Sequence, residues 1–337
     1  MPATIKDVAK VAGVSISTVS RVINDSKPVS SEARKKVLDA IEKLGYKPNE
    51  VARTLVTKRS YLIGIIVTDI GNPYVAEIVR GIEEVGRMYD YDIILCSSYG
   101  DRKSELKFIN LLTGKQTEGI ILVSEKMNNE AIELLKSYKL PYIYLNRYLN
   151  VKELPTVSID SVEASYEMTK YLLEAGHRDI MYITASIDEN SIEKSKIEGY
   201  ENALKELEIE NSIILEAEGF TIEDGYNIGE KVLKQLKEEK MSAIFCGQDE
   251  VAIGVMNYLY DQGIKVPKDI TVVGYGDIKI SSIYRPKLTT VKEPGYDIGA
   301  VSIRRIIKKI EGEEIEEPQI NLPIRIVKRE SCGKNKI

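Results

Sequence analysis

Short apolar runs alternate with amphipathic segments from Tyr61 almost to the end of this 337-residue chain, and this alternation constrains the fold most strongly. Strands that are separated by helices pair in parallel, because each crossover helix lies on a face of the sheet. The pattern therefore predicts an α/β fold. The expected strands are 62–67, 92–96, 119–123, 142–145, 180–183, 213–215, 243–246, 271–275 and 324–327. The expected helices are 74–89, 103–112, 130–138, 162–175, 193–207, 222–236, 250–262 and 297–310.

The alternation divides into two series of similar length, which join near Asp160 and again near Thr290. We expect two lobes, with ligands bound at the carboxyl ends of the strands. No G-x-G-x-x-G turn and no P-loop occurs, so no nucleotide cofactor is expected. The expected domains are a head, a linker, an N-terminal lobe and a C-terminal lobe, with bounds 1–47, 48–60, 61–160 plus 291–320, and 161–290 plus 321–331.

The first 24 residues have the pattern of two short helices joined by a tight turn. Thr4 is a good N-cap, and Asp7 stands three residues later, where a capping box needs an acceptor. Gly13 permits the positive φ that a sharp helix exit requires, and Ser15 can cap the second helix. The pattern is typical of a helix-turn-helix, although a helical hairpin that only packs on another element would show it too.

The outward face of the second helix favours the nucleic-acid interpretation. Apolar residues at helical spacing mark its buried side. The opposite side carries short or hydrogen-bonding side chains that suit base edges and phosphates, namely Ile16, Ser17, Ser20, Arg21 and Asn24. Residues 1–60 contain twelve Lys and Arg against six Asp and Glu, a net charge of +6 within a chain of net charge −5. A basic head on an acidic body suits phosphate contacts made by the head.

A third helix completes the head, and a short linker follows it. Residues 31–44 form the expected third helix, which ends at Gly45. Asn49 can cap a linker helix of about two turns, which is too short to be stable alone in water. We therefore expect this linker helix to be ordered only when something binds it.

Few residues are available for catalysis, metal binding or disulfides. The three cysteines are scattered, and His177 is the single histidine, which we interpret as a structural residue in a connector. No apolar run is long enough for a membrane span, and the start lacks signal-peptide features. We expect a cytoplasmic protein that is not an enzyme. A solute-binding protein and an α/β enzyme with an Asp/Lys site are the alternatives from other classes.

The chain resembles the lactose-repressor (LacI) family of bacterial transcription regulators. The resemblance is carried most strongly by residues 5–9 and 14–22, and then by 45–49, 72–74, 176–178 and 285–291. It implies a helix-turn-helix head, a hinge helix and a two-lobed, periplasmic-binding-protein-like core of parallel sheets. It also implies a homodimer on a pseudo-palindromic operator in double-stranded DNA.

The resemblance implies roles for residues of the head and linker. Ile16, Ser17 and Arg21 would lie in the major groove, where Arg21 suits a bidentate contact to guanine. Leu55 would be a minor-groove wedge, with Ala52 beside it. Phosphate contacts would come from Thr4, Ser15, Thr18 and Asn24.

The resemblance also implies that the core binds a small sugar or sugar phosphate. The matching positions are Tyr74, Arg147, Asp160, Asn190, Lys196, Phe220, Asp249 and Asp277. The family's usual Gly-Phe/Tyr-Asp turn reads Gly274-Tyr275-Gly276-Asp277 here, so the acid is displaced by one residue. A vestigial cleft with no specific effector is the alternative interpretation.

Within the family, the chain is most similar to the Gram-positive regulators of carbon catabolism. That similarity implies a corepressor, the phosphocarrier protein HPr phosphorylated on serine. The positions implied for this contact are Tyr296, Asp297, Ala300, Arg304 and Arg305. The alternative is a sugar- or nucleobase-responsive local repressor without a phosphoprotein partner.

Overall fold

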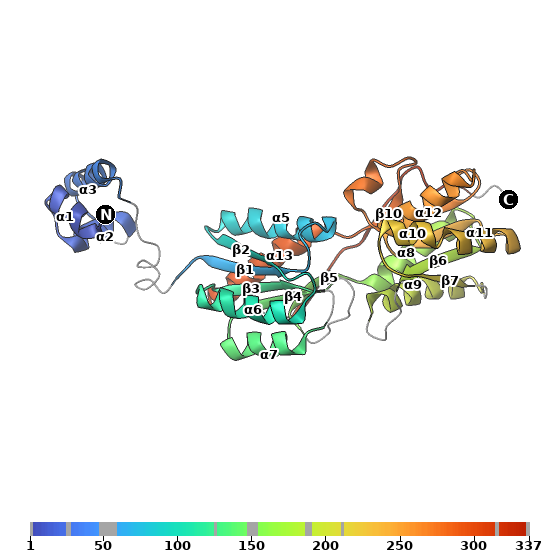
Figure 1. The fold of residues 1–337 in the computed structure, drawn as a ribbon, viewed down its shortest axis with the longest axis horizontal. Helices are drawn as coiled ribbons and strands as arrows, with labels where there is room; N and C mark the ends of the chain where they lie inside the picture. Colours follow the sequence, from blue (N-terminus) through green and yellow to red (C-terminus); the bar gives the residue numbers. More distant parts are fainter. Residues whose placement is uncertain are drawn as a thin grey trace. The chain divides into compact units, whose positions relative to one another are not determined.

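The computed structural model describes residues 3–24, 28–46, 59–124, 127–146, 154–185, 191–209, 212–313 and 317–334. The chain forms two compact units, Met1–Ser60 and Tyr61–Ile337, which we call the head unit and the core unit (Figure 1). Among the described residues, no helix has both the length and the apolar character needed to cross a membrane.

The head unit has the three helices that the sequence predicts. They are α1 (Ile5–Ala12), α2 (Ile16–Asn24) and α3 (Ser31–Leu44). The exits of α1 and α3 lie at Gly13 and Gly45, whose φ values of 65° and 57° are ones that glycine adopts readily. Val8, Val19 and Val37 are completely buried where the three helices meet. Each helix therefore contributes one apolar side to a small common core.

The first half of the core unit is a parallel four-stranded sheet with the order β2-β1-β3-β4. Its strands are β1 (Leu62–Val67), β2 (Asp92–Ser97), β3 (Gly119–Val123) and β4 (Tyr142–Leu145). Helices α5 (Pro73–Met88) and α13 (Gly295–Ile310) pack on one face. Helices α6 (Arg102–Gly114) and α7 (Asn129–Tyr138) cover the other face (Figure 1).

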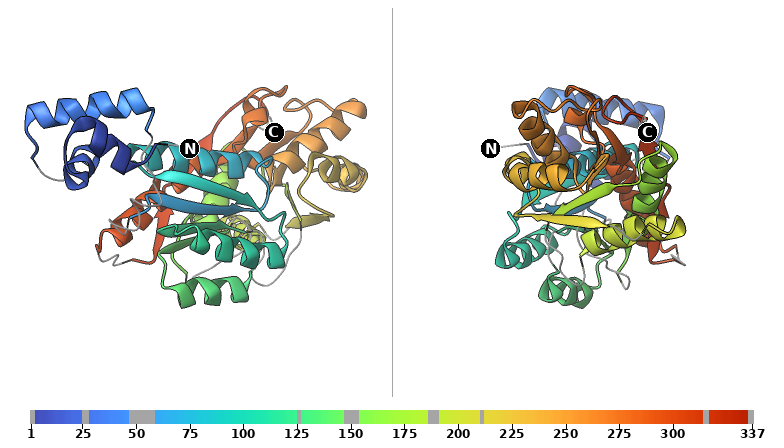
Figure 2. Two further views of the ribbon diagram at one scale, coloured as in Figure 1. Left: turned by 60° about the vertical axis from the view of Figure 1, so that its left-hand side comes forward. Right: turned by 90° about the vertical axis from the view of Figure 1, so that its right-hand side faces the viewer.

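The second half is a six-stranded sheet with the order β12-β10-β9-β8-β6-β7, in which only β12 runs antiparallel to its neighbour. Its strands are β6 (Ile180–Ala185), β7 (Ile213–Ala217), β8 (Ala243–Cys246), β9 (Thr271–Gly276), β10 (Thr289–Lys292) and β12 (Arg325–Val327). Helices α8 (Ser161–Glu174) and α9 (Ile192–Glu206) pack on one face. The other face carries α10 (Ile222–Asn227), α11 (Gly229–Glu238) and α12 (Asp249–Asp261) (Figure 2).

The secondary structure differs from the prediction in two ways. The single helix expected at 222–236 is broken at Ile228 into α10 and α11. Gly225 and Gly229 border this break, and a Cβ on either would collide with Val251 or Tyr258 of α12. Three short strands were also not predicted, namely β5 (Thr156–Ile159), β10 and β11 (Gln319–Leu322). β5 and β11 pair with each other in a separate two-stranded sheet.

Candidate nucleic-acid interface and effector residues

The amino end of α2 is organised by Ser15. Its hydroxyl accepts a hydrogen bond from the Thr18 N–H at 3.1 Å and lies 2.8 Å from the hydroxyls of both Ser17 and Thr18. This N-cap satisfies a backbone donor at the helix start. The predicted cap is confirmed, and three hydroxyl groups gather at this exposed end of the helix.

The outer face of α2 presents the side chains that were predicted to read bases. Ile16 is 46 % exposed, and Ser17 and Arg21 are also exposed. The inner face is anchored, because Val19 and Val22 are buried against α1 and α3. A helix held on one side and polar on the other can enter a major groove without rearrangement. Asn24 is the last residue of α2, and its side chain lies outside what the structure describes.

The start of α1 is capped by an interaction between Thr4 and Asp7. The Asp7 carboxylate accepts hydrogen bonds from the Thr4 N–H at 2.9 Å and from the Thr4 hydroxyl at 2.7 Å. These two bonds lower the pKa of Asp7. Thr4 is exposed at this helix start, where a phosphate contact was predicted for it.

Four residues with predicted roles lie outside the described part of the chain. They are the linker residues Ala52 and Leu55, and the effector positions Arg147 and Asn190.

Lys196, a predicted effector residue, is completely buried in the core unit. Its ammonium donates hydrogen bonds to the Glu193 carboxylate at 2.7 Å and to the Gly247 carbonyl at 2.9 Å. It also lies 4.1 Å from the centroid of the Tyr275 ring. The Lys196 ammonium therefore donates these hydrogen bonds to acceptors within this chain.

Asp249 is also completely buried and is surrounded by donors. Its carboxylate accepts hydrogen bonds from the Ile278 N–H at 3.0 Å, the Ser281 hydroxyl at 2.7 Å and the Thr290 hydroxyl at 2.5 Å. Burial raises the pKa of this carboxyl to about 6, although hydrogen bonds from Thr290 and Ser281 oppose the shift. The Asp249 side chain therefore connects the start of α12 to β10.

Asp277 lies close to this network but is paired elsewhere. Its carboxylate is 2.5 Å from the Arg329 guanidinium, and its N–H donates to the Thr290 hydroxyl at 3.4 Å. The structure thus gathers Lys196, Asp249 and Asp277 around the carboxyl ends of β8 and β9. The sequence did not reveal Glu193, Thr290 and Arg329 as their partners. The only local signal was the i,i+3 spacing of Glu193 and Lys196.

The remaining described effector positions have structural contacts as well. Tyr74 and Phe220 are half-buried and pack against the cores of the first and second sheets respectively. Asp160 is exposed and caps α8, where it accepts from the Val162 N–H at 2.9 Å and the Glu163 N–H at 3.1 Å.

The predicted partner-binding residues all lie on α13, but only two of them are exposed. Asp297 and Arg304 are exposed, whereas Ala300 is 6 % exposed. Arg305 is 7 % exposed, and its guanidinium donates to the Glu317 carbonyl. The two adjacent arginines therefore have different environments, and Arg304 is the one that faces solvent.

Tyr296 lies at the start of α13 in contact with α5. Its hydroxyl donates to the Glu84 carboxylate at 2.9 Å, and this bond raises the pKa of Tyr296. The Arg80 guanidinium lies 5.2 Å from the centre of its ring.

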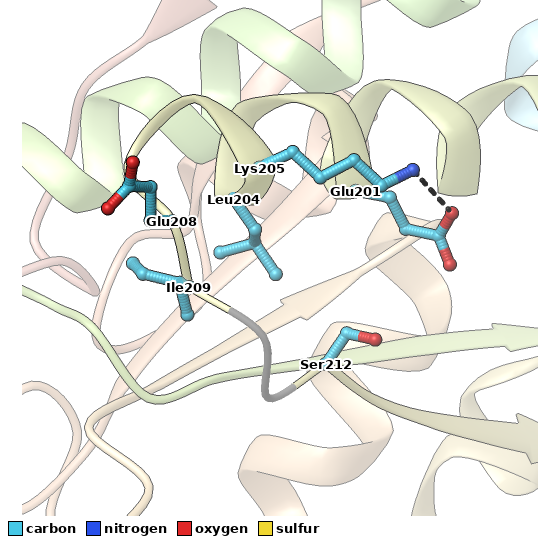
Figure 3. Close-up of a pocket in the computed structure, with 6 residues that line it drawn as sticks. All are labelled: Glu201, Leu204, Lys205, Glu208, Ile209 and Ser212. Carbon is cyan, nitrogen blue, oxygen red and sulfur yellow. Dashed lines mark ion pairs between the residues drawn. The ribbon is translucent and has the colours of Figure 1, made fainter.

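A surface hollow of about 760 Å³ lies where α9 ends and the chain continues into β7 (Figure 3). It is lined by Glu201, Leu204, Lys205, Glu208, Ile209 and Ser212. None of the predicted effector residues is among these lining residues.

Two family models match the chain and together span most of it. Residues 4–49 match the model described as "Bacterial regulatory proteins, lacI family". Residues 60–330 match "Periplasmic binding proteins and sugar binding domain of LacI family".

Similar proteins are known in sequence and in structure. Catabolite control protein A of Priestia megaterium is 39 % identical over 98 % of this chain and 99 % of its own length. The HTH-type transcriptional regulator RegA of Clostridium saccharobutylicum is 40 % identical over 98 % of this chain and 99 % of its own length. The crystal structure of CcpA of Lactococcus lactis matches with a TM-score of 0.73 and 30 % identity, covering 80 % of this chain and 98 % of that one. The lac repressor dimer bound to operator and the anti-inducer ONPF matches with a TM-score of 0.86 and 26 % identity, covering 99 % of this chain and 100 % of that one.

Proposed function

Because the chain belongs to the lacI family of bacterial regulatory proteins and is a DNA-binding transcription regulator, we propose that it represses genes of carbon metabolism as a homodimer. The observation that carries this proposal is the similarity to catabolite control protein A along nearly the whole chain. The relatives are regulators, not enzymes, and the function rests on selective binding.

On DNA, the exposed face of α2 enters the major groove. Arg21 reads a guanine there, while Ile16 and Ser17 contact neighbouring base edges. Thr4, Ser15, Thr18 and Asn24 contact phosphates and set the register of the helix. Two heads on one homodimer require a pseudo-palindromic operator. In the linker of residues 48–60, Leu55 acts as a minor-groove wedge with Ala52 beside it.

The core regulates operator affinity by binding a corepressor, either serine-phosphorylated HPr or a sugar phosphate or both. A corepressor that binds better to the DNA-competent form shifts the population toward that form. Arg304 supports a phosphoserine contact, because it is exposed on α13. Arg305 already donates to the Glu317 carbonyl, so it contributes mainly by holding that segment against α13.

The proposal is tested by selecting duplexes from a randomised pool with the full-length chain, followed by calorimetry with HPr. We expect selection of a palindromic site, and tighter binding of serine-phosphorylated HPr than of unmodified HPr. Arg304→Ala should weaken the phosphoprotein contact, whereas Lys136→Ala, an exposed lysine on α7, should leave it unchanged. If neither form of HPr binds, the phosphoprotein corepressor is ruled out, and a sugar- or nucleobase-responsive local repressor becomes the better description.

A further inference from the structure

Three residues line the amino-terminal edge of the first sheet, each immediately before a strand. Tyr91 precedes β2, Tyr61 precedes β1 and Glu118 precedes β3. The sheet order is β2-β1-β3, and all these pairings are parallel. The residues before parallel strands meet at one edge of a sheet, so these three side chains lie next to one another across three strands.

Glu118 links the other two residues through its carboxylate. One oxygen accepts a hydrogen bond from the Tyr61 N–H at 2.9 Å, and the other accepts from the Tyr91 hydroxyl at 3.0 Å. The rings of Tyr61 and Tyr91 pack together with centroids 5.6 Å apart. Tyr91 is only 4 % exposed. Hydrogen bonds to an ionised carboxylate are stronger than neutral ones, so this bridge restrains both partners.

The backbone of Tyr61 is held in an unusual conformation at this point. Its φ of 54° lies in the left-handed region, which is unfavourable for a tyrosine. Its carbonyl accepts the Asp92 N–H at 2.8 Å, while its own N–H is directed to Glu118. The surrounding contacts must therefore maintain the conformation, and Glu118 supplies one of them by accepting the Tyr61 N–H.

Tyr61 is also the first residue of the core unit, so the chain from the head enters the core at this residue. We infer that Glu118 is a positioning residue for DNA binding: it fixes the backbone of Tyr61, the residue at which the linker joins the core. This inference rests on the proposed function as a DNA-binding dimer.

The physical reason is the cost of ordering a tether. When two tethered heads bind one operator, the second binding event is intramolecular, and its strength depends on how well the tether directs the head. A linker whose start is already oriented loses less conformational freedom on binding. Nonspecific binding of a random duplex through phosphate contacts depends much less on the orientation of the linker's start.

The test compares full-length variants on two duplexes of equal length. One is the palindromic duplex selected by the wild-type chain from a randomised pool, and the other has a random sequence. Glu118→Ala should weaken binding to the selected duplex about tenfold, within the usual range of coupling between sites, and leave random-duplex binding unchanged. Glu118→Gln should weaken binding to the selected duplex less, about threefold, because its amide oxygen still accepts the Tyr61 N–H but its NH2 group cannot accept from the Tyr91 hydroxyl.

Two further variants distinguish a positioning role of Glu118 from a folding defect. Glu133→Ala is the matched control, since Glu133 is exposed on α7 and should affect neither duplex. Tyr91→Phe removes only the hydroxyl that holds Glu118, and should weaken selected-duplex binding about threefold. If Glu118→Ala does not fold, this variant decides the question.

The outcomes separate positioning from general stability. An unchanged ratio of selected-duplex to random-duplex affinity in the Ala and Phe variants would overturn the inference. So would a parallel loss of affinity for both duplexes together with a lower melting temperature of the core. If the wild-type chain selects no duplex at all, the proposed function fails first, and the inference fails with it.

Discussion

The Lys196 ammonium lies 2.7 Å from the Glu193 carboxylate, and both side chains are completely buried. The two residues are one turn apart on α9. The Thr184 hydroxyl donates to the second oxygen of Glu193 at 2.8 Å. Removing two charges from water is costly, and only good geometry with further hydrogen bonds offsets that cost. This pair therefore links α9 to β6, through Thr184, and to the end of β8, through Gly247.

Lys196→Met should lower the free energy of unfolding of the core by about 3–5 kcal/mol, because it leaves the Glu193 carboxylate buried without its countercharge. The double variant with Glu193→Gln should lose less than the single one. Urea denaturation followed by tyrosine fluorescence measures this, since every tyrosine except Tyr46 lies in the core unit. Lys136→Ala, which breaks an exposed pair with Glu133, is the control and should cost less than about 1 kcal/mol. A Lys196→Met loss no larger than the control would contradict the prediction.

The stability of the core should depend on pH through Asp249. Burial raises the pKa of its carboxyl from 3.8 to about 6, so the folded chain binds this proton at a higher pH than the unfolded chain does. The stability contributed by protonation is present below pH 3.8 and is lost as the pH rises through about 6. Asp249→Asn removes this titration. The wild-type unfolding free energy should therefore fall relative to the variant, on the order of 2 kcal/mol between pH 4 and 7.

Urea denaturation at several pH values checks the Asp249 prediction. Asp90→Asn is the control, because Asp90 is exposed on the first half of the core unit. Parallel pH profiles for the wild type and Asp249→Asn would show that this carboxyl does not titrate in that window.

The sequence predicted the strands that are marked by their own composition. β1, β3, β4 and β8 begin and end where they were expected, because a strand buried on both faces is a continuous apolar run. The short strands β5 and β11 carry no such signal. They pair with each other across more than 150 residues of chain, for example Val157 with Ile320. Their existence depends on that partner and not on local composition.

The surroundings of the proposed effector residues were not predictable for the same reason. Lys196 and Asp249 were identified through the family resemblance, which gives positions and no contacts. Lys196 donates a hydrogen bond to the carbonyl of Gly247, and Asp249 accepts one from the hydroxyl of Thr290. These partners come from other elements, so only the folded chain shows that both side chains are buried and paired.

The chain following β12 is expected to stabilise the second sheet through Ser331. This buried hydroxyl accepts from the Thr289 N–H at 2.8 Å and donates to the Val272 carbonyl at 2.6 Å. Ser331→Ala leaves a buried N–H without this acceptor, which should cost about 1–3 kcal/mol of unfolding free energy. The measurement is again urea denaturation. Ser282→Ala is the matched control, because Ser282 is exposed and bonds only locally to the Lys279 carbonyl. Equal effects of the two variants would be evidence against a stabilising role for this segment.

Arg21→Ala should reduce the selectivity of operator binding at one base pair by about 1–3 kcal/mol, because a bidentate contact to guanine is lost. The side chain is exposed on α2, and the buried side of that helix is unchanged, so the head should still fold. Competition between the selected duplex and single-base variants measures the loss position by position. Arg87→Ala removes the same charge from an exposed site on α5 and should leave every position unchanged. If Arg21→Ala weakens all the duplexes by the same factor, Arg21 contacts phosphate and not a base, and the base contacts must come from other residues of α2.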